Sequence, residues 1–193
     1  MDLTTITPSP AGLKALAHPA RLRMLGLLRT EGPATATTLA ERLDINTGAA
    51  SYHLRQLAQH GFVVDDDSRG NRRDRWWQAA HQVTMTSSDL VGDPATRDTV
   101  DAYIQSVVVV MTEQLQRAVE ERSELAPEWR DAETFSDWGF RMTPVRARAL
   151  VEALAASLGE TEEDDGEDAA DFVIQVNAYP RPGRLTTTSG EAS

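Results

Sequence analysis

The stretch Asn46–Ala80, NTGAASYHLRQLAQHGFVVDDDSRGNRRDRWWQAA, decides the fold. Its first part predicts a helix over residues 47–59, which Thr47 can cap and Gly61 can end in the left-handed conformation that glycine tolerates. Apolar residues recur at helical spacing on one face, at Ala50, Leu54, Leu57 and Ala58. Two short strand-forming runs follow and flank an arginine-rich tip: Phe62–Val64 and Arg75–Gln78. The stretch therefore predicts a helix followed by a β-hairpin.

The opposite face of the predicted helix carries small, polar and cationic side chains. Such a face can approach base edges and phosphates without a clash, although contact with solvent alone is the simpler alternative. The candidate DNA-binding residues on this helix are Thr47, Gly48, Ser51, Tyr52, Arg55 and Gln56. Arg55 is the best candidate for a base or phosphate contact, and Tyr52 can pack on a sugar or a thymine methyl. His53 is expected to hold the helix against the hairpin.

The hairpin tip and a short preceding helix offer further contacts. Arginines at the tip can reach a minor groove or its flanking phosphates, but the neighbouring run Asp65–Asp67 can pair with some of them. The candidate DNA-binding residues at the tip are Arg69, Asn71, Arg72, Arg73 and Arg75. Thr37 and Thr38 lie at a predicted helix N-terminus, where backbone N–H groups can bind a phosphate. Helix capping explains these two threonines equally well.

Charge is distributed unevenly along the chain. The formal net charge is −11, which alone argues against nucleic acid. Residues 13–82 hold 10 Lys+Arg and 7 Asp+Glu, whereas the remainder holds 9 and 23. Because phosphate contacts are short-range in salt, a locally basic segment is what decides DNA affinity. The acidic remainder is expected to limit non-specific DNA binding.

The residues before residue 46 predict three shorter helices. Residues 1–9 are expected to be a flexible lead-in, a short helix follows over 10–17, and Pro19 begins the second helix. A third helix of about seven residues, a tight turn and then the longer helix form a helix-turn-helix. These elements predict a winged-helix DNA-binding domain at residues 10–82. The expected N-caps are Ser9 for the first helix and Thr37 or Thr38 for the third.

The segments KALAHPARLRMLGLL (14–28), TTLAERLDINTGAASYHLRQLAQHGFV (37–63) and RGNRRDRWWQ (69–78) together resemble the ArsR-type winged-helix repressors of bacteria. The resemblance covers under half of the chain, but its pieces occur in order and at the expected spacings. It implies a dimeric transcription regulator that binds operator DNA and releases it on a signal.

Metal sensing, the best-known activity of the ArsR family, is not expected in this chain. The resemblance places one family site on residues 37–43, which contain no cysteine, and another on the dimer helix. The segment 95–121 contains Asp98, Asp101 and Glu113 but no histidine. The four histidines of the chain all lie within residues 13–82. We therefore expect neither a metal nor a cofactor.

A long amphipathic helix is predicted over residues 95–122. Its apolar residues recur at steps of three and four, and about 27 residues of helix span roughly 40 Å. The preceding domain is too short to cover that length, so a second copy of the same helix is the expected cover. The candidate interface residues of this homodimer are Val100, Ile104, Val107, Val108, Met111 and Leu115.

The last part of the chain predicts a small strand–helix–strand unit over residues 135–180. Strands are expected at 135–142 and 172–179, around a helix that Thr143 caps, and residues 184–193 are expected to be disordered. The fold class is thus mainly α with α+β elements. Aromatic side chains offer a candidate pocket for a small organic effector, with an ordinary aromatic core as the alternative. They are Tyr103, Trp129, Trp138, Phe140, Phe172 and Tyr179.

Composition excludes several classes of protein. The chain has 193 residues and no cysteine, so disulfides and thiolate sites are absent. No signal peptide is evident, and the longest apolar run, Val107–Met111, is too short to span a membrane, so a cytoplasmic location is expected. No catalytic constellation stands out, and we expect no enzyme. The sequence favours a homodimeric repressor that binds double-stranded DNA at a partly palindromic operator; the alternative is a winged-helix module that binds a partner protein.

Overall fold

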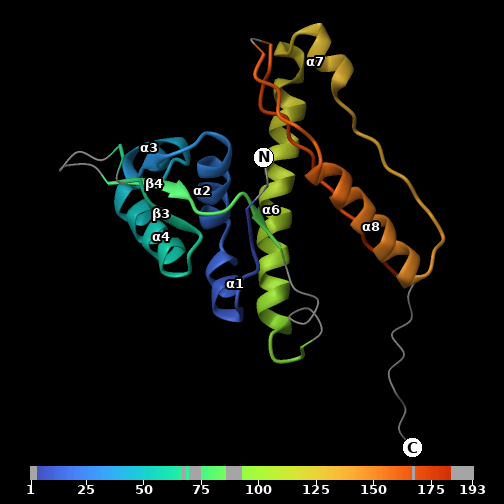
Figure 1. Cartoon of the computed structure of the whole chain (residues 1–193), viewed down its shortest axis with the longest axis horizontal. Coiled ribbons are helices and arrows are strands. Elements are labelled where there is room, and N and C mark those ends of the chain that lie inside the picture. Colours follow the sequence, from blue (N-terminus) through green and yellow to red (C-terminus); the bar gives the residue numbers. More distant parts are fainter. Residues whose placement is uncertain (1–3, 67, 70–74, 86–92, 167, 184–193) are drawn as a thin grey trace, which may run out of the picture. The chain divides into compact units, whose positions relative to one another are not determined.

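Helix α4 (Thr47–Gln59) lies where the sequence predicts it, and each strand of the hairpin that follows lies one residue later than predicted (Figure 1). Strand β3 (Val63–Asp65) pairs antiparallel with β4 (Trp76–Ala79), with Val63 opposite Ala79. Gly61 ends the helix at a φ of 75°, as expected. The predicted cap was one residue too late: Asn46, not Thr47, accepts the Ala49 N–H at 2.8 Å.

The computed structural model describes residues 4–66, 68–69, 75–85, 93–166 and 168–183. Its chain forms two units, Met1–Thr134 and Phe135–Ser193. Among the described residues, no helix combines the length and apolar content that crossing a membrane requires. The predicted disordered tail at 184–193 lies outside the described residues.

Three helices precede α4, namely α1 (Pro10–Leu16), α2 (Pro19–Thr30) and α3 (Ala36–Arg42). Ser9 caps α1, as predicted, by accepting the Gly12 N–H at 3.2 Å. The predicted cap of α3 was wrong, because Thr35 accepts the Thr38 N–H at 3.1 Å and the helix begins at Ala36.

Two further strand pairings were not predicted. Strand β2 (Ala34–Thr35) joins the hairpin to give the order β2-β4-β3. Strand β1 (Thr5–Ile6) pairs parallel with β5 (Val83–Thr84). The expectation of a flexible lead-in was therefore wrong for residues 4–6, because their carbonyl groups accept N–H groups that follow β4. Arg29 of α2 also contacts the segment between β4 and β5, because its Nε donates to the His81 carbonyl at 2.8 Å.

The core of the first unit lies where α1, α2, α3 and α4 meet the small sheet. The largest side chains that are fully buried there are Phe62, Leu13, Leu16, Met24, Leu25, Leu39, Leu54, Leu57 and Val63. Trp77 of β4 closes this core at 3% exposure. The inner face of α4 is anchored by Leu54 and Leu57, and its polar outer face is thereby turned away from the protein.

Helix α6 (Arg97–Glu121) is long, as predicted, and packs beside α1 and α2 (Figure 1). The 3₁₀ helix η1 (Arg122–Glu124) and α7 (Pro127–Ala132) follow it. Arg23 of α2 donates from Nε to Glu113 of α6 at 2.8 Å, and Tyr103 packs against the core. These contacts join α6 to the helix bundle that supports α4.

The second unit contains α8 (Pro144–Gly159), which Thr143 caps as predicted by accepting the Arg146 N–H at 3.3 Å. The strands predicted at 135–142 and 172–179 were wrong, because those residues have no strand assignment. Alternating apolar side chains favour an extended chain, but a strand also needs a neighbouring backbone to pair with. No such pairing forms within the described residues of this unit.

Candidate nucleic-acid interface

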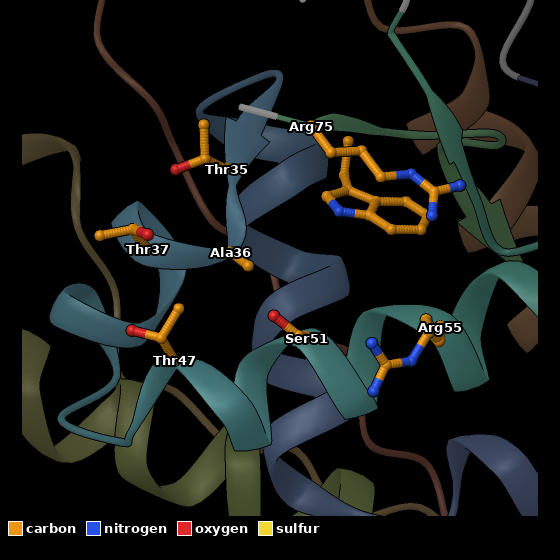
Figure 2. A pocket seen from close by; sticks show the side chains of 8 residues that line it. Thr35, Ala36, Thr37, Thr47, Ser51, Arg55 and Arg75 are labelled. Atoms are coloured by element: carbon orange, nitrogen blue, oxygen red, sulfur yellow. The ribbon is translucent and has the colours of Figure 1, made fainter. Parts of the chain in front are cut away.

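A groove of about 230 Å³ opens between α3, α4 and β4. Its lining is mostly polar: Thr35, Thr37, Thr47, Ser51, Arg55 and Arg75, with Ala36 and Trp77. Figure 2 shows Ser51 and Arg55 rising from α4 on one side, and the threonines at the start of α3 on the other. Hydroxyl and guanidinium groups therefore converge in a cleft beside the exposed face of α4.

Arg75 is held at the edge of this groove by contacts with Trp77 and Asp65. Its guanidinium lies 4.1 Å from the centre of the Trp77 ring, in a cation–π contact, and it forms an ion pair with Asp65. The hydrogen bond from Arg75 lowers the pKa of Asp65, so this carboxylate stays ionised at neutral pH. Arg69 likewise pairs with Asp66 at 3.6 Å. The aspartates beside the hairpin tip thus partly neutralise the arginines, as the sequence suggested.

The structure brings together only part of the predicted DNA-binding set. Thr37, Thr47, Ser51, Arg55 and Arg75 line the groove. Gly48 and Tyr52 are exposed on the outer face of α4, and Gln56 beside them is half-buried. Asn71, Arg72 and Arg73 lie outside the described residues. Sequence reasoning missed Thr35, which no local signal separates from the threonines that follow it.

A second polar cluster lies where the start of α2 meets α4. Its four members are His18, Arg21, Tyr52 and His53, and we call it the imidazole–arginine cluster. The rings of His18 and His53 are 4.6 Å apart, and Tyr52 meets His53 edge-on at 5.5 Å. His18 caps α2, since its Nδ1 accepts the Ala20 N–H at 3.2 Å. The sequence placed His53 against the hairpin, but its ring contacts are to His18 and Tyr52.

Both imidazoles of this cluster resist protonation. Burial lowers the pKa of His18, and the positive charges of Arg21 and Arg23 lower it further. Burial also lowers the pKa of His53, with smaller contributions from His18 and Arg21. The folded protein therefore holds both rings neutral at pH values where an unfolded histidine, with a pKa of 6.5, binds a proton.

Acidification is expected to destabilise the fold through these two rings. As the pH falls through 6.5, the unfolded chain takes up protons that the folded state resists, so the free energy of unfolding decreases. Urea denaturation at pH 7.5 and pH 5.5 measures this loss. The double variant His18→Gln, His53→Gln should lose less stability between the two pH values than the wild type. An equal loss in both proteins would contradict the assignment.

The candidate dimer residues of α6 do not all share one environment. Val100 is 3% exposed and belongs to the interior of its own unit, so its prediction as an interface residue was wrong. Ile104, Val108 and Leu115 are exposed, at 47%, 51% and 49%. Val107 and Met111 are half-buried between these two faces. The stripe of α6 that lies away from its own domain is therefore narrower than predicted and begins at Ile104.

The aromatic residues of the candidate effector pocket are divided between the two units. Tyr103 packs against the core of the first unit, where burial raises its pKa, and Trp129 is half-buried in α7. The four members in the second unit are exposed: Trp138, Phe140, Phe172 and Tyr179. The pocket stays a prediction. Within the described part of the chain, no three His, Asp or Glu side chains are grouped to hold a metal ion.

This geometry is that of a winged helix: a short helix, a turn, an anchored second helix with a polar outer face, and an antiparallel hairpin beside it. Residues 16–65 match the family model of the helix-turn-helix domain. The HTH-type transcriptional regulator NmtR of Mycobacterium tuberculosis is 46% identical over 54 residues, which are 28% of this chain and 44% of NmtR. The matched segment thus spans less than half of that relative.

Two solved structures are also similar. One is a possible transcriptional regulator for arsenical resistance, with 25% identity and a TM-score of 0.32, covering 55% of this chain and 93% of that one. The other is the YusO protein of Bacillus subtilis, with 16% identity and a TM-score of 0.32, covering 77% and 84%. Residues 16–65 therefore form a helix-turn-helix domain, which resembles those of the ArsR-type regulators as the sequence predicted.

Proposed function

We propose that this protein is a transcriptional regulator that binds double-stranded DNA through α4. The observation that carries the proposal is the outer face of α4 with its adjoining groove. Arg55, Ser51 and Thr47 share that groove with Arg75, which directly precedes β4, while Leu54 and Leu57 fix the helix from behind. A rigid helix with this polar face fits the major groove, which is about 12 Å wide. Arg75 then lies beside the phosphates that border it.

The proposed functional form is a homodimer built on α6. Ile104, Val108 and Leu115 form one stripe at helical spacing, and Val119 extends it at 53% exposure. Burial of such a stripe against a second copy removes apolar surface from water, which favours association. Two α4 helices would then enter successive major grooves, about 34 Å apart, on a partly palindromic operator. Occupation of an operator that overlaps a promoter would make the protein a repressor, and an organic effector would act by releasing it.

Recovery of bound fragments from genomic DNA tests this function. The purified protein is mixed with sheared genomic DNA of its source organism, and the retained fragments are sequenced. A recovered duplex should bind at least about 1,000-fold more tightly than a scrambled duplex at physiological salt. Its affinity should fall steeply between 50 and 200 mM salt. A failure to recover any preferred duplex would sink the proposal, and a stoichiometric protein partner would then favour the protein-interaction alternative.

A further inference from the structure

The imidazole–arginine cluster lies on the flank of α4 opposite the wing, which is the hairpin of β3 and β4. Ser51 and Arg55 line the groove toward β4. His53 is two residues after Ser51 and two residues before Arg55. In a helix of 3.6 residues per turn, two residues correspond to about 200°, so His53 lies on roughly the opposite side of α4 from both. His53 accordingly contacts His18 at the start of α2. The reading face, with Tyr52 exposed on it, therefore lies between two polar flanks.

A helix in a major groove has a DNA backbone on each side. An α-helix with its side chains is about 10–12 Å wide, and the major groove is about 12 Å wide. Side chains on both flanks of α4 thus come close to phosphates. On one flank these side chains are Arg75 and the groove threonines. On the other flank they are His18 and Arg21 of the imidazole–arginine cluster.

The charge of Arg21 has no anion to balance it within the described part of the chain. Its neighbour on the same helix, Arg23, is paired with Glu113, but no described carboxylate forms an ion pair with Arg21. Nε of Arg21 and Nδ1 of His53 are both buried and have no hydrogen-bond partner among the described residues. A half-buried guanidinium without a counter-charge is costly, so the site favours an anionic ligand.

His18 adds a hydrogen-bond donor to this site. Its Nδ1 accepts the Ala20 N–H, so the neutral ring carries its proton on Nε2. The ring is half-buried and in contact with His53. A guanidinium and an imidazole N–H together suit a phosphate diester, which offers charged oxygen acceptors.

We propose that Arg21, assisted by Nε2 of His18, binds a DNA backbone phosphate on the flank of α4 opposite the wing. This inference rests on the proposed function, because it requires α4 to occupy a major groove. It assigns to the start of α2 a role that complements Arg75, the residue before β4. The two flanks would hold the reading helix between the two backbones.

The test compares Arg21→Gln with Arg117→Gln by fluorescence anisotropy on the recovered duplex and on a scrambled one. Arg117 is an exposed arginine of α6, so its variant loses the same charge away from α4. Arg21→Gln should weaken binding to both duplexes roughly tenfold and reduce the slope of log K against log salt by about 0.9. Arg117→Gln should leave affinity and slope unchanged. A slope in Arg21→Gln equal to that of the wild type would overturn the inference.

Neutral methylphosphonate linkages locate the phosphate. One substitution, at a linkage that borders the major groove away from the wing, should weaken the wild type but not Arg21→Gln. Arg21→Lys, which keeps the charge, should retain the full slope of log K against log salt. This variant is the control for a loss of binding that is caused by misfolding. Equal sensitivity of wild type and Arg21→Gln at every linkage would overturn the inference while leaving the proposed function intact. If the wild type itself prefers no duplex, the proposed function and this inference fail together.

Discussion

Val108→Asp is expected to convert the protein from a dimer into a monomer. Val108 is 51% exposed in a single chain, so an aspartate there is solvated in the monomer and leaves its fold intact. In the proposed dimer the same carboxylate, contributed by both copies, would be buried against apolar side chains without a partner, which is strongly unfavourable. Since two linked heads bind far more tightly than one, operator affinity should fall by about 100-fold or more.

Sedimentation velocity at micromolar concentration measures the change in mass, and anisotropy measures operator binding. Ala102→Asp is the matched control, because Ala102 is exposed on the same helix but about 120° around it from Val108. The control should remain dimeric. A dimeric Val108→Asp protein would show that α6 does not form the interface.

Arg55→Ala is expected to weaken operator binding by about 1–3 kcal/mol if the guanidinium contacts a base. Arg55 is exposed at the groove, so its removal should leave the free energy of unfolding nearly unchanged. Specificity at one base position should relax, which competition with single-base variants of the operator detects. An Arg55→Ala protein with wild-type affinity and specificity would place this side chain in solvent.

The neighbouring substitution Leu54→Ala supplies the contrasting control. Leu54 is 0% exposed, and truncation of a buried leucine typically costs about 2–5 kcal/mol of stability. At temperatures where Leu54→Ala is still folded, its operator affinity should stay near that of the wild type. Of these two adjacent substitutions, Leu54→Ala should therefore lower stability and Arg55→Ala should lower operator affinity.

Local periodicity was sufficient to predict α4, the hairpin and α6. The apolar spacing of Leu54 and Leu57 determines which face of α4 is buried, and Gly61 ends the helix through its own backbone freedom. The interface predicted at Arg55, Ser51 and Thr47 follows from that same spacing, since these residues lie away from the core. Their assignment to DNA stays a prediction.

Features that depend on distant pairing were not predictable from local patterns. Thr35 caps α3 at the end of strand Ala34–Thr35, and this strand forms by pairing with β4, which is far away in the sequence. Val100 belongs to the apolar pattern of α6 but is buried within its own chain. Periodicity alone does not distinguish such a residue from one that is buried against a second copy. The strand prediction at 172–179 failed for a related reason, because alternation does not provide a second strand.

Helix α6 is connected to the domain that carries α4, here called the head, by packing on α1 and α2 and by hydrogen bonds between Arg23 and Glu113. Arg23 lies on α2, which packs against α4, and Glu113 lies about two thirds of the way along α6. In the proposed dimer, a rotation at the α6–α6 interface would therefore rotate each head as a rigid body. DNA tolerates only head spacings near its helical repeat of about 34 Å. An effector that opened or twisted the α6–α6 interface would change the distance between the two α4 helices. They would then no longer fit successive major grooves, although the effector contacts no DNA-binding residue.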